Sequence, residues 1–184
     1  MTTVSLKKRS WSATRIGGMA LAVGLVTTAF TTAFTTPAHA LADVITVHVN
    51  GRTVFITGTP GKDVINITNL AGKVSVGVDT SVTAGAGCAV KGPQVVDCTG
   101  TGSGILFIEA STIGGDDSVN NQTSLQSSML GGSGVDRLTG GSGRDGLNGG
   151  SGDDILKGGG DIDTANGAAG TDTCTAETES NCEV

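Results

Sequence analysis

The sequence is poor in aromatic residues and contains no tyrosine. Of its 184 residues only 3% are aromatic, with four Phe and a single Trp, Trp11. Beyond residue 40 only Phe55 and Phe107 remain. A large aromatic core is therefore excluded, and burial of apolar side chains alone would stabilise the chain poorly.

Histidine is almost as scarce, because the chain has only His39 and His48. This scarcity excludes a histidine-rich zinc site, and a Ser-His-Asp triad would depend on His48 alone. His48 falls in an expected strand, where a solvent-exposed position is the simpler interpretation. We therefore expect no catalytic residues and no enzymatic activity.

The N-terminal segment, 1–40, has the pattern of a secretory signal peptide. A basic start is followed by an apolar stretch from Ile16 to Phe34 and by Ala38-His39-Ala40, a cleavage site of small residues. We expect the mature protein to begin at Leu41 and to be extracellular, either free or loosely associated with the cell surface. The alternative is an uncleaved anchor helix, which glycines and four threonines in the stretch disfavour. No later segment is apolar enough to span a membrane.

Removing this leader makes the chain strongly acidic. It takes away four of the 11 Lys and Arg and none of the 17 Asp and Glu, leaving seven basic side chains and a net charge of −10. Such a charge repels nucleic acid and anionic lipid and attracts cations. We expect cations rather than nucleic acid as partners, and a monomer; the sequence identifies no protein or surface partner.

Four cysteines in an exported chain predict two disulfides, because their spacing lacks the paired C-x-x-C pattern of a zinc site. The sequence leaves the connectivity open, but the local pairs are Cys88 with Cys98 and Cys174 with Cys182. Each pair would close a short loop and stabilise its own end of the molecule. Free structural thiols are the alternative.

From residue 41 to about residue 110, short alternating runs of apolar and polar residues separated by glycine predict strands and turns. Residues 44–49 and 52–57 have the form of a hairpin, with Asn50-Gly51 as a two-residue turn that needs positive φ at both positions. Further strands are expected at 64–68, 73–79, 94–98 and 105–109. The stretch between Cys88 and Cys98 would be a loop closed by a disulfide.

Beyond Ser111 the glycine content rises and a nonapeptide period appears. Three consecutive copies fit G-G-x-G-x-D-x-(apolar)-x without a gap: 131–139, 140–148 and 149–157. Two weaker copies follow at 158–166 and 167–175, with Asp161 at the fourth position of one and Ala168 at the second position of the other. Fading of the motif toward the C-terminus is typical of a capping coil.

Upstream, Gln122–Leu130 keeps the length but lacks the glycines and the aspartate, which predicts a coil without a metal turn. Isolated partial copies at 58–65 and 115–119 indicate that the N-terminal strands could belong to the same architecture. The alternative for the glycine-rich block is a flexible linker. A linker has no reason to keep Asp and Leu in fixed phase through consecutive copies.

Each nonapeptide combines a turn with a very short strand. Glycines permit the positive-φ turns that aim backbone carbonyls inward, and the next three residues place one apolar side chain toward the core. Two nonapeptides make one flattened coil, so that turns two repeats apart stack on each other. The spacing of strands, about 4.8 Å, accommodates a calcium ion whose oxygen ligands lie about 2.3 to 2.6 Å away.

Stacking would pair Asp136 with Asp154, Asp154 with Asp172, and Asp145 with Asp163, which predicts three well-formed sites, with partial sites at the ends as a further possibility. Calcium is the expected metal because all the ligands offered are oxygen atoms. Without the ion, two carboxylates about 5 Å apart repel by roughly 3 kcal/mol at an effective dielectric near 20. The metal-free roll should therefore be loose or unfolded.

This pattern resembles the haemolysin-type, or RTX, calcium-binding nonapeptide family over residues 131–175. The resemblance implies a parallel β-roll in which turn glycine carbonyls and the aspartate bind Ca²⁺. At the matching positions the implied metal ligands are Gly132, Gly134, Asp136, Gly141, Gly143, Asp145, Gly150, Gly152, Asp154, Gly159, Asp163, Gly170 and Asp172. The departures at Asp161 and Ala168 affect the last sites. The whole layout is also similar to small secreted actinobacterial calcium-binding proteins.

The expected fold is all-β: a parallel β-roll preceded by a strand-rich β region. The expected organisation is a signal peptide (1–40), a β-rich region with a disulfide loop (41–110), the calcium-binding roll (111–176) and a tail closed by a disulfide (177–184). The function is then that of a secreted protein folded by calcium, with a structural or interaction role. The alternatives are a small secreted hydrolase or an adhesin carrying an RTX tail, an export signal, and an ice-binding solenoid.

Overall fold

A computed structural model describes residues 44–70, 72–100, 102 and 104–183 of the chain. The predicted signal peptide, its cleavage site and the predicted start at Leu41 lie outside these residues. The described residues form sixteen strands and no helix, so the all-β expectation is confirmed. Within them no helical segment meets the length and hydropathy needed to cross a membrane.

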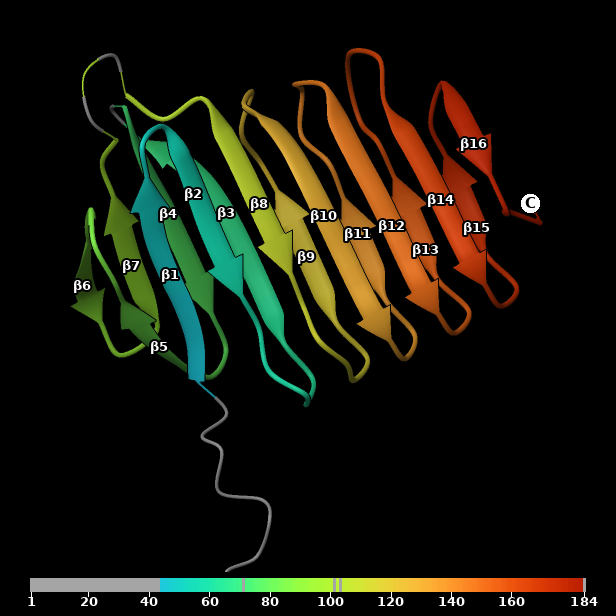
Figure 1. The fold of residues 1–184 in the computed structure, drawn as a ribbon, viewed down its shortest axis with the longest axis horizontal. Coiled ribbons are helices and arrows are strands. Elements are labelled where there is room, and N and C mark those ends of the chain that lie inside the picture. Colours follow the sequence, from blue (N-terminus) through green and yellow to red (C-terminus); the bar gives the residue numbers. More distant parts are fainter. Residues whose placement is uncertain (1–43, 71, 101, 103, 184) are drawn as a thin grey trace, which may run out of the picture. The chain divides into compact units, whose positions relative to one another are not determined.

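The strands form two sheets of eight, and the chain passes from one sheet to the other at nearly every strand of the repeats (Figure 1). The first sheet, in spatial order, contains β16 (Thr178–Ser180), β14 (Thr164–Ala169), β12 (Asp145–Ser151), β10 (Gln126–Ser133), β8 (Phe107–Ser111), β2 (Thr53–Thr57), β1 (Val44–Asn50) and β5 (Ser81–Ala84). The second contains β15 (Thr173–Thr175), β13 (Ile155–Lys157), β11 (Arg137–Thr139), β9 (Ser118–Asn121), β3 (Val64–Leu70), β4 (Lys73–Val78), β7 (Val95–Cys98) and β6 (Cys88–Gly92).

Parallel pairing with a constant offset defines the roll. In the repeats each strand pairs with the strand two repeats later, so that Leu138 lies beside Leu156 and Leu147 beside Ala165. Two nonapeptides therefore make one coil, as the period predicted. The apolar position of every copy points inward: Leu138, Leu147, Leu156 and Ala165 are buried, and Cys174 is partly buried. The parallel β-roll is therefore confirmed.

The N-terminal strands β2 and β3 continue the same coil. Strand β2 pairs in parallel with β8, and β3 pairs in parallel with β9, although the partners, such as Thr53 and Phe107, are distant in the sequence. The intervening strands β4, β6 and β7 form an antiparallel extension of the second sheet, while β5 pairs with β1. Parallel coiling thus begins before residue 111, and the antiparallel strands are an insertion into it.

The hairpin of β1 and β2 forms, but its turn lies one residue later than the sequence predicted. Asn50 pairs with Thr53, so the two turn residues are Gly51 and Arg52. Gly51 has a φ of 61°, and Asn50 does not have a positive φ. Glycine at the first turn position is typical of a type II′ turn, whereas the predicted type I′ turn requires two positive φ angles. Strand register, set by the buried Val47 and Val54, therefore overrides the local Asn-Gly preference.

Candidate metal centre

The turns of the roll stack in two columns, one at each edge of the sheets. Column one contains the turns that lead from the first sheet to the second: 58–63, 112–117, 131–136, 149–154 and 167–172. Column two contains the turns that lead back, including 140–145 and 158–163. Because adjacent strands are fixed in register by the parallel ladders, each turn lies directly against the same turn of the next coil.

The repeat aspartates are buried inside these columns. Asp136, Asp145, Asp154, Asp163 and Asp172 each expose 2% of their surface or less. Every one lies at the sixth position of its nonapeptide, where the strand that follows fixes the direction of the side chain. Carboxylates are rarely buried unless they are paired or bind a metal ion. These aspartates therefore do not serve solubility, and their burial needs a compensating partner inside the columns.

Each carboxylate reaches back toward the preceding turn of its column. Asp154 Oδ1 accepts a hydrogen bond from the backbone N–H of Asp136 at 2.8 Å, and Asp172 Oδ1 does the same for Asp154. In column two, Asp163 Oδ1 accepts the N–H of Asp145 at 2.8 Å. The three predicted pairs are thus neighbours in the structure, and each pair is joined through one oxygen of the later aspartate.

The second oxygen of most of these carboxylates is buried without a partner. Among the described residues this is true of Oδ2 in Asp117, Asp136, Asp154, Asp163 and Asp172. A buried acceptor without a donor costs free energy, and native proteins leave few such atoms. Asp145 differs, because its two oxygens accept hydrogen bonds from the Ser127 hydroxyl and the Gly141 N–H. The unpartnered oxygens are a set of ligands that a cation would complete.

Backbone carbonyls of the glycines point along the columns. A Cβ atom built on Gly152 would collide with the carbonyl oxygen of Gly134, and one on Gly150 would collide with that of Gly132. The same relation places Gly170 against the Gly152 carbonyl and Gly159 against the Gly141 carbonyl. Gly143 likewise faces the carbonyls of the preceding coil. Glycine is required here because carbonyl oxygens occupy the space in which a side chain would lie.

The two positions that depart from the motif both have a positive φ, although neither residue is glycine. Asp161, where the other copies have glycine, has a φ of 74°, and Ala168 has a φ of 77°. These are left-handed values that residues with a Cβ adopt at a cost of about 1–2 kcal/mol. The φ of Ala168 is smaller than that of Gly132 and Gly150 at the same position, 113° and 112°, so this turn keeps the sign of φ but not its value.

Burial and mutual repulsion raise the pKa values of several of these carboxyl groups. Desolvation is the main cause for Asp136, whose pKa rises from 3.8 to about 6, and the charges of Asp117 and Asp154 raise the pKa further. Desolvation also raises the pKa values of Asp117, Asp145 and Asp154. Ionised aspartates are therefore disfavoured in the columns until a positive charge compensates them.

The donor chemistry is that of a hard cation. The turns offer carboxylate and carbonyl oxygens from flexible glycine-rich backbone, which suits the six to eight oxygen ligands of Ca²⁺. In the described part of the chain no three His, Cys, Asp or Glu side chains gather at one point. Each space between two turns therefore contains only a few carboxylates. Backbone carbonyl oxygens would supply many of the remaining ligands of a bound ion.

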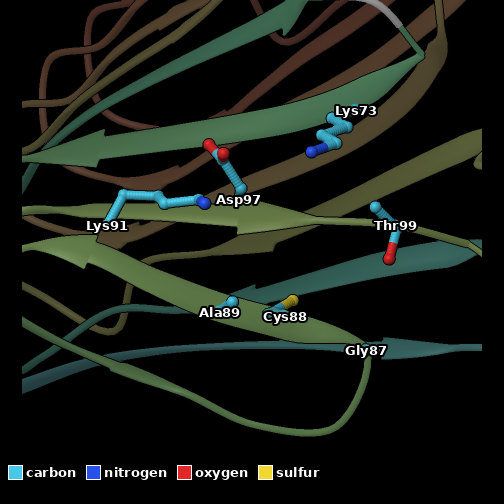
Figure 2. Close-up of a pocket in the computed structure, with 7 residues that line it drawn as sticks. All are labelled: Lys73, Gly87, Cys88, Ala89, Lys91, Asp97 and Thr99. Atoms are coloured by element: carbon cyan, nitrogen blue, oxygen red, sulfur yellow. The ribbon is translucent and has the colours of Figure 1, made fainter.

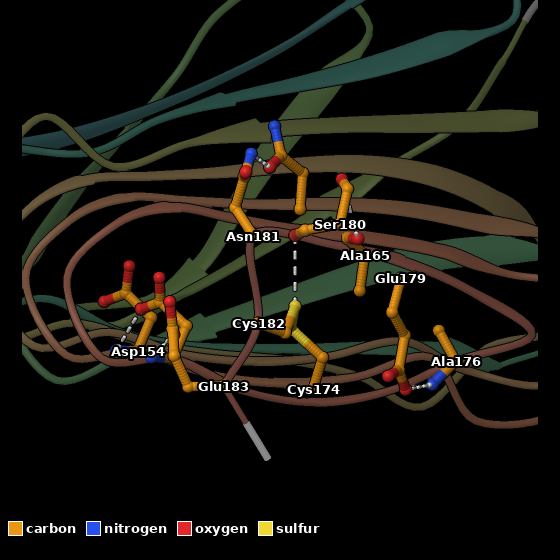
Figure 3. The surroundings of a disulfide bond; sticks show 11 residues. Asp154, Ala165, Cys174, Ala176, Glu179, Ser180, Asn181, Cys182 and Glu183 are labelled. Carbon is orange, nitrogen blue, oxygen red and sulfur yellow. Dashed lines mark hydrogen bonds between the residues drawn. A yellow bond between two sulfur atoms is a disulfide. The ribbon is translucent and has the colours of Figure 1, made fainter.

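Glutamates close both columns at the C-terminal end, and the sequence pattern did not reveal them. Glu177 Oε2 accepts the Asp163 N–H at 2.8 Å, and Glu183 Oε2 accepts the Asp172 N–H at 2.6 Å. Figure 3 shows Glu183 beside the disulfide between Cys174 and Cys182, which ties this terminal segment to β15. Acidic residues just after the last repeat were the available signal.

The second disulfide, Cys88 with Cys98, is also formed, and it joins β6 to β7 in the insertion. Beside it lies a pocket of about 210 Å³ lined by Lys73, Gly87, Cys88, Ala89, Lys91, Asp97 and Thr99. Figure 2 shows the Asp97 carboxylate between the side chains of Lys73 and Lys91. The pocket contains none of the predicted metal ligands.

Fold and site together define a cation-binding parallel β-roll. Residues 130–165 and 148–178 match the family model of the RTX calcium-binding nonapeptide repeat, in four copies. This segment therefore consists of haemolysin-type RTX repeats, which bind Ca²⁺. No curated protein and no solved structure matches the chain.

Proposed function

We propose that calcium held between successive turns folds and stabilises the β-roll, and that this roll serves a structural or interaction role outside the cell. The supporting observation is the row of buried Oδ2 atoms without partners in Asp136, Asp154, Asp163 and Asp172. Ionised and unpaired, these groups would oppose folding. With a divalent ion between them they would instead hold successive coils together.

The size of the effect supports a coupling between calcium binding and folding. A site filled at ten times its dissociation constant stabilises the folded state by about 1.4 kcal/mol. Three such sites contribute about 4 kcal/mol, which approaches the whole net stability of a small domain. One apolar side chain for each nonapeptide supplies a small core, so calcium would decide whether the roll is folded.

An extracellular location and the absence of enzymatic activity belong to the same proposal. Two disulfides support an oxidising compartment. His48, in β1, is exposed and stacks on Phe55 with ring centroids 5.1 Å apart. Its strand position supports a packing role for the ring.

Far-ultraviolet circular dichroism of the purified protein with calcium and with a chelator tests this proposal. We expect a strand signal with calcium and a large loss of that signal with chelator. Magnesium at equal concentration is the control, and it should restore much less of the signal because Mg²⁺ demands stricter octahedral geometry. Identical spectra with calcium and chelator would contradict the proposal.

A further inference from the structure

Two turns of column one lie outside the segment that matches the repeat family. They are residues 58–63, with the sequence GTPGKD, and residues 112–117, with the sequence TIGGDD. The pairing of β2 with β8 and of β3 with β9 stacks these two turns on each other. The pairing of β8 with β10 and of β9 with β11 then stacks the turn 112–117 on the turn 131–136. Column one thus extends across the insertion to residues far upstream of the repeats.

The carboxylates of these turns repeat the geometry found in the repeats. Asp136 Oδ1 accepts the N–H of Asp117 at 2.9 Å, and Asp117 Oδ1 accepts the N–H of Asp63 at 2.7 Å. Asp117 exposes 2% of its surface, and its Oδ2 is buried without a partner. Thr112, which stands where the repeats have glycine, lowers the pKa of Asp117 by its closeness, but its hydroxyl donates to the Gly131 carbonyl. Oδ2 of Asp117 therefore stays without a partner, as in the repeat aspartates of the same column.

Backbone carbonyls accompany it in the same way. A Cβ on Gly134 would collide with the Gly115 carbonyl oxygen, and a Cβ on Gly115 would lie 2.8 Å from the Gly61 carbonyl oxygen. The fourth position of each turn thus directs its carbonyl toward the next turn along the column. Oxygen ligands of both kinds are present in the two spaces on either side of the turn 112–117.

The column ends at the first turn. Both oxygens of Asp63 accept hydrogen bonds from Thr59, with the backbone N–H at 2.7 Å and the hydroxyl at 3.0 Å. A hydroxyl donor therefore satisfies this aspartate within its own turn. In column two a hydroxyl also donates to the first repeat aspartate, Asp145, but the donor, Ser127, lies one coil earlier. Hydroxyl groups terminate the columns at one end, as the glutamates do at the other.

We propose that the calcium column continues upstream of the repeats, with one ion beside Asp136 between turns 112–117 and 131–136 and one beside Asp117 between turns 58–63 and 112–117. The second ion joins turns on opposite sides of the antiparallel insertion, and so ties the N-terminal strands to the repeats. This inference rests on the proposed function, because it assumes that calcium occupies the repeat turns themselves.

Calcium counting by equilibrium dialysis of the full chain tests the inference. The unpartnered Oδ2 atoms predict five bound ions, whereas the repeat pairs alone predict three. Asp117→Asn should bind four. The matched control is Asp116→Asn, which removes the same charge from the neighbouring exposed residue and should still bind five. Three ions in the parent chain, or an unchanged number in Asp117→Asn, would overturn this inference alone; no bound calcium would overturn the proposed function as well.

Hydrogen exchange of the parent chain gives a readout that does not depend on the folding of a variant. Calcium should slow exchange by about tenfold or more in residues 58–64 and 112–118, as we also expect in the repeat turns. Slowing confined to residues 131–172 would show that the column stops at the repeats.

Discussion

From Val44 to Cys98 the strands bury alternate aliphatic side chains, and from Gln126 to Thr175 the same architecture buries carboxylates. The first region contributes ten buried aliphatic residues, including Ile45, Ile56 and Ile67, and a single buried aspartate, Asp63. The second contributes only Met129, three leucines and Ala165, together with five buried aspartates. A parallel coil can therefore be stabilised either by apolar burial or by bound ions. Only the second kind of stability should depend on calcium concentration and pH.

Removing calcium should produce the largest difference in stability between the two regions. In chelator, amides of β10 to β15 should lose their protection from hydrogen exchange, because about 4 kcal/mol of ion binding is lost from the repeats. Amides of β1, β3, β4 and β7 should retain protection, since their core is aliphatic. Hydrogen exchange with mass spectrometry measures both. Simultaneous loss in the two regions would show that the coil unfolds as one unit.

Substituting one repeat aspartate should weaken calcium binding at a single site of the column. Asp154→Asn removes the charge at one site, and we expect a loss of about 2 kcal/mol of stability in calcium and one fewer bound ion. Denaturant titration measures the stability. Asp153→Asn is the control, because Asp153 is exposed and an Asn oxygen could still accept the Thr171 N–H. Equal losses in the two variants would show that net charge, rather than the buried site, is responsible.

Acid should partly replace calcium. The pKa of Asp136 is about 6 in the fold against 3.8 for an ordinary carboxyl group, so the folded state binds more protons between these values. The stability of the calcium-free roll should therefore rise as the pH falls from about 6 toward 4. This gain should be lost as the pH rises through 6, because Asp136 then ionises in the folded state. Circular dichroism in chelator would follow the strand signal. Asp136→Asn should reduce this pH dependence, and an unchanged profile would contradict the assignment.

The smallest effect is expected at Ala168. Glycine there would relieve the left-handed φ of 77° but would increase the entropy of the unfolded chain, for a net gain of about 0.5 kcal/mol. The control is Ala169→Gly, where no positive φ exists and glycine should destabilise by a similar amount. Thermal unfolding in calcium compares the two. Destabilisation by both substitutions would mean that the alanine side chain itself contributes.

The repeats were predictable because their signals are local. A nonapeptide period fixes the phase of Leu138 and Leu156 and of Asp136 and Asp154, and the structure places them as neighbours. The pairs of cysteines were likewise indicated by their proximity in sequence, and both are formed. Both signals can be read from residues that are close in the sequence, so they do not depend on how distant segments pair.

The rest depended on pairing between distant segments. Continuation of the coil to β2 and β3 follows from ladders that bridge the insertion, and single partial copies at 58–65 and 115–119 were too short to establish it. The Asn50-Gly51 turn moved by one residue because the strands set its register. Glu177 and Glu183 lie outside the motif, and their longer side chains reach the last N–H groups from irregular positions.

Each repeat aspartate accepts a hydrogen bond from the turn one coil earlier, so the two ends of a column are not equivalent. Every turn receives an acceptor from the turn that follows it and supplies one to the turn before, so a whole coil of two nonapeptides could be inserted within the repeats without leaving either neighbour unsatisfied. Removing the segment after β15 is a different matter, because it takes away Glu183, which accepts the Asp172 N–H. Length can therefore vary in the interior of such a protein, while the acidic residue that closes the column must be kept.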